Sequence, residues 1–217
     1  MNKRFDHAAL KPEVTEKQIV TLCKEARQYD LFAVAVNPVW VSLARNELAG
    51  TGIRVVSVAG FPLGASRSEI KVAEAVRAVG DGAQEIDMVA NIGWIISGQF
   101  DRAKDEISTV RKNLPYNVLL KVIIESGLLT KGQQLECLKI VIDGGAQFVK
   151  TSTGFFGGAT VDQVARLVKA SKGGVEVKAS GGIRSLRQCR ELLDAGATRL
   201  GSSSSAAIMN EYLSRRE

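Results

Sequence analysis

Short runs of β-branched and other apolar residues alternate along the chain with longer segments in which apolar residues recur every three or four positions. The short runs have the length of buried strands, and the longer segments have the spacing of amphipathic helices. Strands are predicted at Phe5–Leu10, Phe32–Val36, Ile53–Ala59, Gln84–Val89, Val118–Glu125, Gln147–Ser152, Val175–Ser180 and Thr198–Gly201. Helices are predicted at Thr15–Tyr29, Ser66–Gly80, Phe100–Asn113, Thr130–Ile142, Thr160–Ala170, Ser185–Ala195 and Ser203–Leu213.

The order of these elements predicts one architecture. The strands recur about every 27 residues, close to the roughly 30 residues of a βα unit, and such alternation is typical of a parallel sheet covered by helices. Eight strands in this alternation predict an α/β fold, a (β/α)8 TIM barrel that forms a single domain over residues 1–217. An open, doubly wound sheet is the alternative, but no GxGxxG motif follows the first clear strand. In the helix predicted at 66–80, Ile70, Ala73, Val76 and Val79 share one apolar face.

Composition narrows the classes of function. The net charge is +6, but the basic residues are spread along the chain and only 6% of residues are aromatic, so we expect no nucleic-acid partner. No stretch approaches the roughly 18 apolar residues of a membrane span, and residues 1–10 lack an apolar signal core. We therefore expect no membrane association and a cytoplasmic location. Three scattered cysteines and a single histidine, His7, argue against disulfides and zinc sites, and no metal or other cofactor is expected.

Charged residues interrupt strands whose interiors should be apolar, and four of them raise the question of function. They are Lys121 in LLKVIIE, Lys150 in QFVKTS, Lys178 in VEVKAS and Asp87 in EIDMVA. An unpaired charge is very costly to bury, so these residues must be paired, neutralised or functional. Because side chains alternate across a strand, each faces either the barrel axis or the apolar layer under the helices. The axis is the less costly place, since there the charges can meet and pair.

Lys150 and Lys178 lie on the sixth and seventh predicted strands, which would be neighbours about 4.8 Å apart. Repulsion between two ammonium groups at that spacing favours the loss of one proton, so a neutral amine becomes available near neutral pH. A neutral lysine in a dry pocket can attack a carbonyl group and form a Schiff base, and Asp87 nearby can move protons. A passive ion network inside the barrel is the alternative interpretation.

Two glycine- and serine-rich loops follow the last two predicted strands. They read SGGIR at 180–184 and GSSSS at 201–205. In barrels of this kind, these loops often bind phosphate through backbone N–H groups and a helix N-terminus. The STG segment at 152–154 can contribute to the same cradle. Ordinary turns are the alternative interpretation of each loop.

Nine segments, in order along nearly the whole chain, resemble deoxyribose-phosphate aldolases. They are DHAALKP (6–12), VAVNP (34–38), GFPLG (60–64), EIDMVANIG (85–93), LLKVIIE (119–125), FVKTSTGF (148–155), GGAT (157–160), VKASGGIR (177–184) and TRLGSSS (198–204). The resemblance implies a barrel lyase of deoxyribonucleotide catabolism that needs no cofactor. Such an enzyme reversibly cleaves 2-deoxy-D-ribose 5-phosphate to D-glyceraldehyde 3-phosphate and acetaldehyde through a lysine Schiff base. A homodimer or homotetramer is also expected.

The resemblance assigns roles residue by residue. Lys150 in VKTSTGF is the nucleophile, Lys178 in VKASGGIR perturbs it and joins proton transfer, and Asp87 in EIDMV gives and accepts protons. The phosphate contacts fall on Gly154, Gly181, Gly182, Gly201, Ser202 and Ser203. Asp6 would help to order a catalytic water, and Lys121 would lie at the pocket edge.

The chain also departs from the family pattern. Ala8 stands where a threonine is usual, and the loop GFFGG at 154–158 is one residue shorter than the usual pattern. Two other functions stay open. A lysine aldolase for another sugar phosphate would share the chemistry and differ only in substrate turnover. A binding protein with a merely ion-paired interior would keep all its activity if Lys150 were replaced by leucine.

Overall fold

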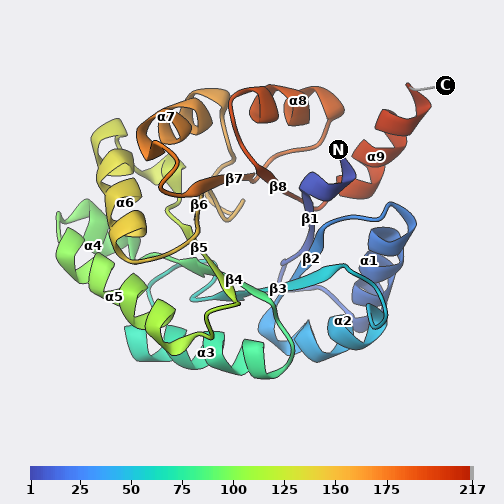
Figure 1. The fold of residues 1–217 in the computed structure, drawn as a ribbon, viewed down its shortest axis with the longest axis horizontal. Helices are drawn as coiled ribbons and strands as arrows, with labels where there is room; N and C mark the ends of the chain where they lie inside the picture. Colours follow the sequence, from blue (N-terminus) through green and yellow to red (C-terminus); the bar gives the residue numbers. More distant parts are fainter. Residues whose placement is uncertain (216–217) are drawn as a thin grey trace.

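Eight parallel strands close into a barrel in the computed structural model, which describes residues 1–215 (Figure 1). The strands are β1 (Phe5–Ala9), β2 (Ala33–Val36), β3 (Arg54–Ala59), β4 (Glu85–Val89), β5 (Leu119–Ile123), β6 (Phe148–Lys150), β7 (Glu176–Ser180) and β8 (Arg199–Ser202). Each strand pairs with its neighbours in sequence, and β8 pairs with β1 to close the sheet. The predicted (β/α)8 barrel is confirmed. Residues 216–217 of the expected domain lie outside the described residues.

Helices surround the barrel on its outer side (Figure 1). They are α1 (Glu16–Gln28), α2 (Val41–Glu47), α3 (Ser68–Gly80), α4 (Ile92–Ile96), α5 (Phe100–Asn113), α6 (Lys131–Asp143), α7 (Val161–Ser171), α8 (Leu186–Asp194) and α9 (Ser205–Ser214). The sequence pattern missed α2 and α4, because helices of seven and five residues are too short to show a clear apolar period. Capping boxes begin α1, α6 and α7, where a threonine and a glutamine satisfy each other's backbone N–H groups.

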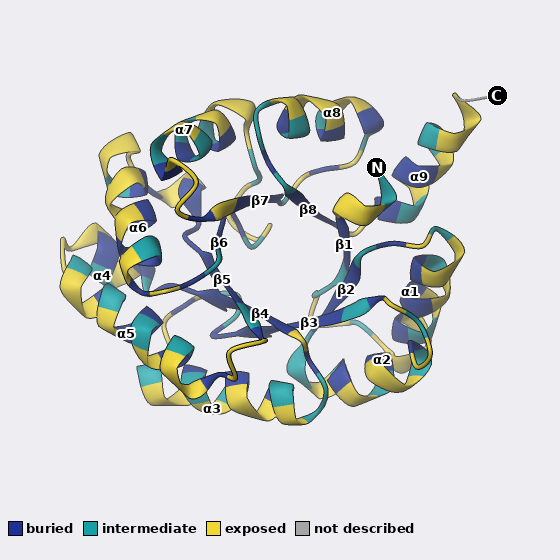
Figure 2. Ribbon diagram, viewed as in Figure 1, coloured by how far each residue is buried: buried dark blue, intermediate teal, exposed yellow. Residues whose placement is uncertain are grey.

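The apolar core lies between the helices and the outer face of the strands (Figure 2). Alternate strand residues point into this layer, for example Val34 of β2 and Ile86 of β4, which are both fully buried. The inner face of the barrel is divided. β2 and β3 contribute the small apolar residues Ala33, Ala35 and Val56, whereas β4 to β8 contribute most of the charged groups. No helix within residues 1–215 is long and apolar enough to cross a membrane.

Helix α3 packs on the barrel through a different face from the apolar one that the sequence pattern indicated. Ile70 and Val76 are 51% and 44% exposed, whereas Lys71 and Ala78 are fully buried. The Nζ atom of Lys71 donates to Oε2 of Glu106 on α5 at 2.9 Å, and neither side chain is exposed. A lysine normally indicates a solvent-facing position, but here a carboxylate from the neighbouring helix makes its burial possible.

Candidate active site

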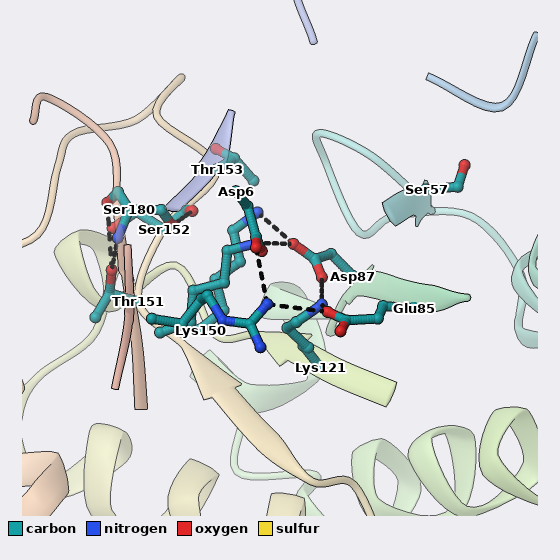
Figure 3. Close-up of polar contacts among 12 residues, drawn as sticks. Asp6, Ser57, Glu85, Asp87, Lys121, Lys150, Thr151, Ser152, Thr153 and Ser180 are labelled. Atoms are coloured by element: carbon teal, nitrogen blue, oxygen red, sulfur yellow. Dashed lines mark hydrogen bonds and ion pairs between the residues drawn. The ribbon is translucent and has the colours of Figure 1, made fainter. Parts of the chain in front are cut away.

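Strand register brings Lys121, Lys150, Lys178 and Asp87 together inside the barrel. Lys150 of β6 pairs in register with Lys178 of β7, and Asp87 of β4 pairs with Lys121 of β5. All four are buried, and the three lysines are hydrogen-bonded to Asp87. Figure 3 shows Asp87 with Lys121 and Lys150. The expectation that these charges meet and pair on the axis is therefore confirmed.

The carboxylate of Asp87 is the centre of this cluster. Its Oδ2 accepts hydrogen bonds from Nζ of Lys150 at 2.9 Å and from Nζ of Lys178 at 2.7 Å. Its Oδ1 accepts one from Nζ of Lys121 at 2.8 Å. Burial raises the pKa of the Asp87 carboxyl, but the three lysine charges together hold it well below its usual range. Asp87 is therefore an ionised acceptor at neutral pH.

The pKa values of Lys150 and of its neighbour Lys121 are shifted in opposite directions. Burial lowers the pKa of Lys150 most, Asp87 opposes this, and the positive charge of Lys178 adds to it, which leaves a pKa of about 8. Burial also acts to lower the pKa of Lys121, but Asp87 and Glu85 outweigh it and raise that pKa. The repulsion between Lys150 and Lys178 expected from their spacing thus contributes, but loss of hydration on burial is the larger cause.

A cavity of about 660 Å³ lies at the carboxyl ends of the strands, where the active sites of such barrels form. Lys150, Lys178 and Asp6 line it, whereas Asp87 lies behind the two amines and does not. Lys121, expected at the pocket edge, does not line the cavity either. It is fully buried because its Nζ pairs with Glu85 at 2.5 Å and with Asp87.

All six residues expected to contact phosphate line this same cavity: Gly154, Gly181, Gly182, Gly201, Ser202 and Ser203. Gly181 has a φ of 86°, a left-handed conformation that glycine adopts without strain. A Cβ added there would lie 2.8 Å from the carbonyl oxygen of Gly157, so the loops after β6 and β7 touch through their backbones. Lys11 and Arg184 also line the cavity and bring positive charge to it. The site therefore suits an anionic ligand.

Residues of the last loop serve different purposes. The Oγ of Ser202 donates to the carbonyl oxygen of Ile183 at 2.7 Å, so this hydroxyl braces the loop. Ser203 is exposed and lines the cavity, which makes its hydroxyl available to a ligand. A Cβ at Gly201 would lie 3.1 Å from Cε of Lys178, so this glycine makes room for the second lysine.

Sequence reasoning gave no role to two buried charges that shape the site. Arg199 begins β8, donates to Oδ1 of Asp6 at 2.8 Å and stacks on Phe32, with 3.6 Å from its Cζ to the ring centroid. Its position two residues before Gly201, on the same strand face, is the signal that could have found it. Glu125 follows β5, and its Oε2 accepts from the backbone N–H of Thr153 at 3.0 Å, which fixes a residue of the cavity wall.

The histidine and cysteines that could have supported other chemistry do not line the cavity. His7 pairs its Nε2 with Oε2 of Glu25 on α1 at 2.8 Å. Cys23, Cys137 and Cys189 are buried and unpaired. Within the part of the chain that the structure describes, no group of three or more His, Cys, Asp or Glu side chains could hold a metal ion. That the protein needs no metal or cofactor stays a prediction.

The closed barrel and the cavity at its carboxyl end define a TIM-barrel enzyme. The sequence pattern of the DeoC/LacD family of aldolases matches residues 1–207. The chain therefore belongs to this family of aldolases.

Curated relatives and solved structures agree with the family assignment. The chain is 45% identical over 210 residues to a deoxyribose-phosphate aldolase of Brevibacillus brevis, covering 96% of this chain and 95% of the relative. It resembles the solved aldolase QR15 with a TM-score of 0.95 and 39% identity, covering 99% of this chain and 96% of the other. It also resembles the tetrameric deoxyribose-phosphate aldolase of Aeropyrum pernix with a TM-score of 0.91 and 32% identity, covering 99% and 91%.

Proposed function

We propose that the protein catalyses the reversible cleavage of 2-deoxy-D-ribose 5-phosphate to D-glyceraldehyde 3-phosphate and acetaldehyde. The observation that carries the proposal is Lys150, whose amine lines the cavity, contacts Asp87 and has a pKa lowered by burial to about 8. The Brevibacillus brevis relative bears the name deoxyribose-phosphate aldolase, which supports the choice of substrate.

The reaction begins when Nζ of Lys150 attacks C1 of the open-chain aldehyde. The C1–N bond forms, the carbonyl oxygen leaves as water, and a protonated imine remains on Lys150. This cation accepts electrons in the next step. The C3 hydroxyl loses its proton, the C2–C3 bond breaks, and its electron pair forms an enamine while C3 becomes the aldehyde carbon of glyceraldehyde 3-phosphate. The enamine then takes a proton at C2, and water releases acetaldehyde and the free amine.

The remaining charged groups move protons around this centre. Lys178 lines the cavity and therefore exchanges protons with the substrate. Asp87 contacts both amines through one oxygen but does not line the cavity, so it relays protons between Lys150 and Lys178 without touching the sugar. Asp6 accepts from Nζ of Lys178 and reaches the cavity, where it orders a water molecule. Lys121 donates to Oδ1 of Asp87, and its positive charge helps to keep this carboxylate ionised.

The phosphate group of the sugar binds in the glycine- and serine-rich loops after β6, β7 and β8. Gly154, Gly181, Gly182, Gly201, Ser202 and Ser203 would contact it, and Lys11 and Arg184 complement its charge. Anchoring this end holds C1 near the amine of Lys150. Such positioning contributes up to about 7–11 kcal/mol to lowering a barrier in favourable cases.

Retro-aldol assays of the wild type and of Lys150→Leu test the proposed reaction. The wild type should release acetaldehyde from 2-deoxy-D-ribose 5-phosphate, and Lys150→Leu should lose roughly 10³-fold or more of this activity. Lys169→Leu, at an exposed position on α7, is the matched control and should stay active. If the wild type does not cleave 2-deoxy-D-ribose 5-phosphate but cleaves a different sugar phosphate, the result favours a lysine aldolase with another substrate. A wild type without any turnover, whose ligand binding is unchanged in Lys150→Leu, would favour the binding-protein alternative.

Assembly and location follow from the same assignment. The Aeropyrum pernix relative is described as tetrameric, which supports a homodimer or homotetramer for this chain. A cytoplasmic location, without nucleic-acid or membrane partners, fits a substrate that is a small phosphorylated sugar. Both stay predictions, and size-exclusion chromatography with light scattering measures the first of them.

A further inference from the structure

Six charged residues inside the barrel form a closed ring in which positive and negative groups alternate. In its first half, Nη1 of Arg199 donates to Oδ1 of Asp6 at 2.8 Å, and Nζ of Lys178 donates to Oδ2 of Asp6. The same Nζ donates to Oδ2 of Asp87 at 2.7 Å. These contacts join β8, β1, β7 and β4 across the barrel interior.

The second half of the ring runs through β4 and β5 (Figure 3). Nζ of Lys121 lies 2.8 Å from Oδ1 of Asp87 and 2.5 Å from Oε2 of Glu85. That Glu85 oxygen also accepts from Nη1 of Arg199 at 3.3 Å, which closes the ring. The order is Arg199, Asp6, Lys178, Asp87, Lys121 and Glu85, so three cations alternate with three anions and their charges cancel. All six side chains are buried, so water screens these charges little.

Lys150 is attached to this ring but is not a member of it. Its amine meets the ring at Oδ2 of Asp87, an oxygen that it shares with Lys178. Because the ring is already neutral, a proton on Lys150 adds one uncompensated positive charge to a buried site. Loss of that proton restores neutrality.

Other strands add little charge around Lys150. β2 reads AVAV and contains no ionisable residue. β3 contributes Arg54, whose Nη1 lies 3.0 Å from Oε1 of Glu85, but its side chain is 40% exposed and therefore screened by water. Glu176 at the start of β7 is exposed. Of these groups only Arg54 contacts the ring, through Glu85 and from a partly hydrated side chain, while the six buried charges balance one another.

Charged residues of the loops are also accounted for. Lys11 and Glu13 line the cavity but are mostly exposed and lie 3.8 Å from each other. Arg184 lines it and is exposed as well. Buried Glu125 directs its Oε2 to the backbone N–H and hydroxyl of Thr153. The buried ring therefore supplies the closest set of fixed charges around Lys150.

We propose that Arg199 and Glu85 are positioning residues that keep this ring neutral and so make Lys150 the amine that gives up its proton. Neither residue lines the cavity, so neither touches the substrate. Arg199 acts through Asp6, and Glu85 acts through Lys121 on Asp87. The proposal rests on the proposed function of Lys150 as nucleophile.

The two residues have opposite effects on Lys150. Without the positive charge of Arg199, the ring becomes net negative, which favours a protonated Lys150. Asp6 is then free to pair with Lys178 alone, so that Asp87 can interact more strongly with the Lys150 ammonium group. Without the negative charge of Glu85, the ring becomes net positive and Lys121 depends on Asp87 alone, which disfavours a protonated Lys150. Charge and geometry therefore act in the same direction in each case.

The test is the pH dependence of trapping with acetaldehyde and cyanoborohydride. The full-length protein is treated at each pH and then digested, and mass spectrometry of the peptides gives the rate at which Lys150 acquires a two-carbon adduct. Relative to the wild type, the midpoint of this rate should move up by about one pH unit in Arg199→Gln and down by about one unit in Glu85→Gln. The double variant, in which the ring is neutral again, should return close to the wild-type midpoint. Arg199→Lys keeps the charge and should also stay there.

Opposite shifts that cancel in the double variant support the proposal. Shifts of the same sign, or unmoved midpoints in both single variants, overturn it, because a merely structural role changes the yield of folded protein without a charge-dependent shift. If Arg199→Gln does not fold, two other results test the proposal. The midpoint should still move down in Glu85→Gln and stay at the wild-type value in Arg199→Lys, and any other result overturns the proposal. Failure of the proposed function looks different, because then the wild type itself forms no adduct on Lys150.

Discussion

Lys150 and Lys178 lie opposite each other on neighbouring strands, and both ammonium nitrogens contact one oxygen, Oδ2 of Asp87, at 2.9 and 2.7 Å. One carboxylate oxygen does not fully compensate two positive charges in a buried site. Lys178 has a second acceptor in Asp6, whereas the ion pairs of the described residues give Lys150 only Asp87. The geometry thus distinguishes two identical side chains by the number of carboxylates that each one contacts.

The pH dependence of cleavage follows from this separation. Burial lowers the pKa of Lys150 to about 8, so its neutral, nucleophilic fraction is small below that pH and grows as the pH rises through it. We predict that kcat/KM for 2-deoxy-D-ribose 5-phosphate rises roughly tenfold per pH unit on the acid side and levels off above about pH 8. Steady-state rates in buffers of constant ionic strength measure this. A flat profile between about pH 6 and about pH 9 would contradict the assignment.

Gly201 tests how closely Lys178 must be placed. A Cβ at this position would lie 3.0 Å from Cβ of Ser180 and 3.1 Å from Cε of Lys178, so Gly201→Ala should displace the second lysine. We predict a fall in kcat of about tenfold or more, as small misplacements at reacting groups commonly cause. Gly132→Ala is the control, because nothing lies within 4 Å of its added Cβ and alanine favours helix α6. Unchanged kcat in Gly201→Ala would show that this contact has no part in the reaction.

Gly181 tests the phosphate site. An alanine there meets the carbonyl oxygen of Gly157 at 2.8 Å and must adopt a φ of 86°, so the loops after β6 and β7 should move apart. We predict that Gly181→Ala raises KM for the phosphorylated sugar by about tenfold, while acetaldehyde trapping on Lys150 continues. Gly173→Ala has similar backbone strain at a φ of 82° but no close contact, and should leave KM unchanged. Loss of trapping together with binding in Gly181→Ala would point to general disruption of the barrel instead.

The buried pair of Lys71 and Glu106 makes a prediction about stability. Glu106→Gln leaves the ammonium group of Lys71 buried without its carboxylate, which should lower the free energy of unfolding by about 3–5 kcal/mol. Asp101→Asn removes an acid that is 98% exposed and should change it by less than about 1 kcal/mol. Urea denaturation of the three proteins measures both effects. Equal stability of Glu106→Gln and the wild type would show that the pair is not needed.

Much of the site could be predicted because charge is rare inside strands. Lys121, Lys150, Lys178 and Asp87 are recognisable as exceptions to an apolar pattern, and the two-residue period of a strand then decides which face they share. Closure of the barrel follows from the count of βα units, and closure is what brings these strands together.

The sequence does not show which oppositely charged residue pairs with each buried charge. Arg199 meets Asp6 across 193 positions of sequence, and Lys71 meets Glu106 across 35, so each looks like an ordinary surface charge in its own segment. Lys121 and Glu85 lie on the neighbouring strands β5 and β4, and only their register in the closed barrel shows that this pair buries Lys121 away from the pocket edge. Local patterns show that a charge needs compensation, but only packing shows which group provides it.

The most direct test of the central claim is the site of covalent attachment. The protein is incubated with acetaldehyde and cyanoborohydride at about pH 8, digested, and mapped by mass spectrometry. The account predicts a two-carbon adduct on Lys150 and none on Lys178, because only the first amine lacks a second carboxylate. An adduct on Lys178 alone, or no adduct on either lysine, would contradict it.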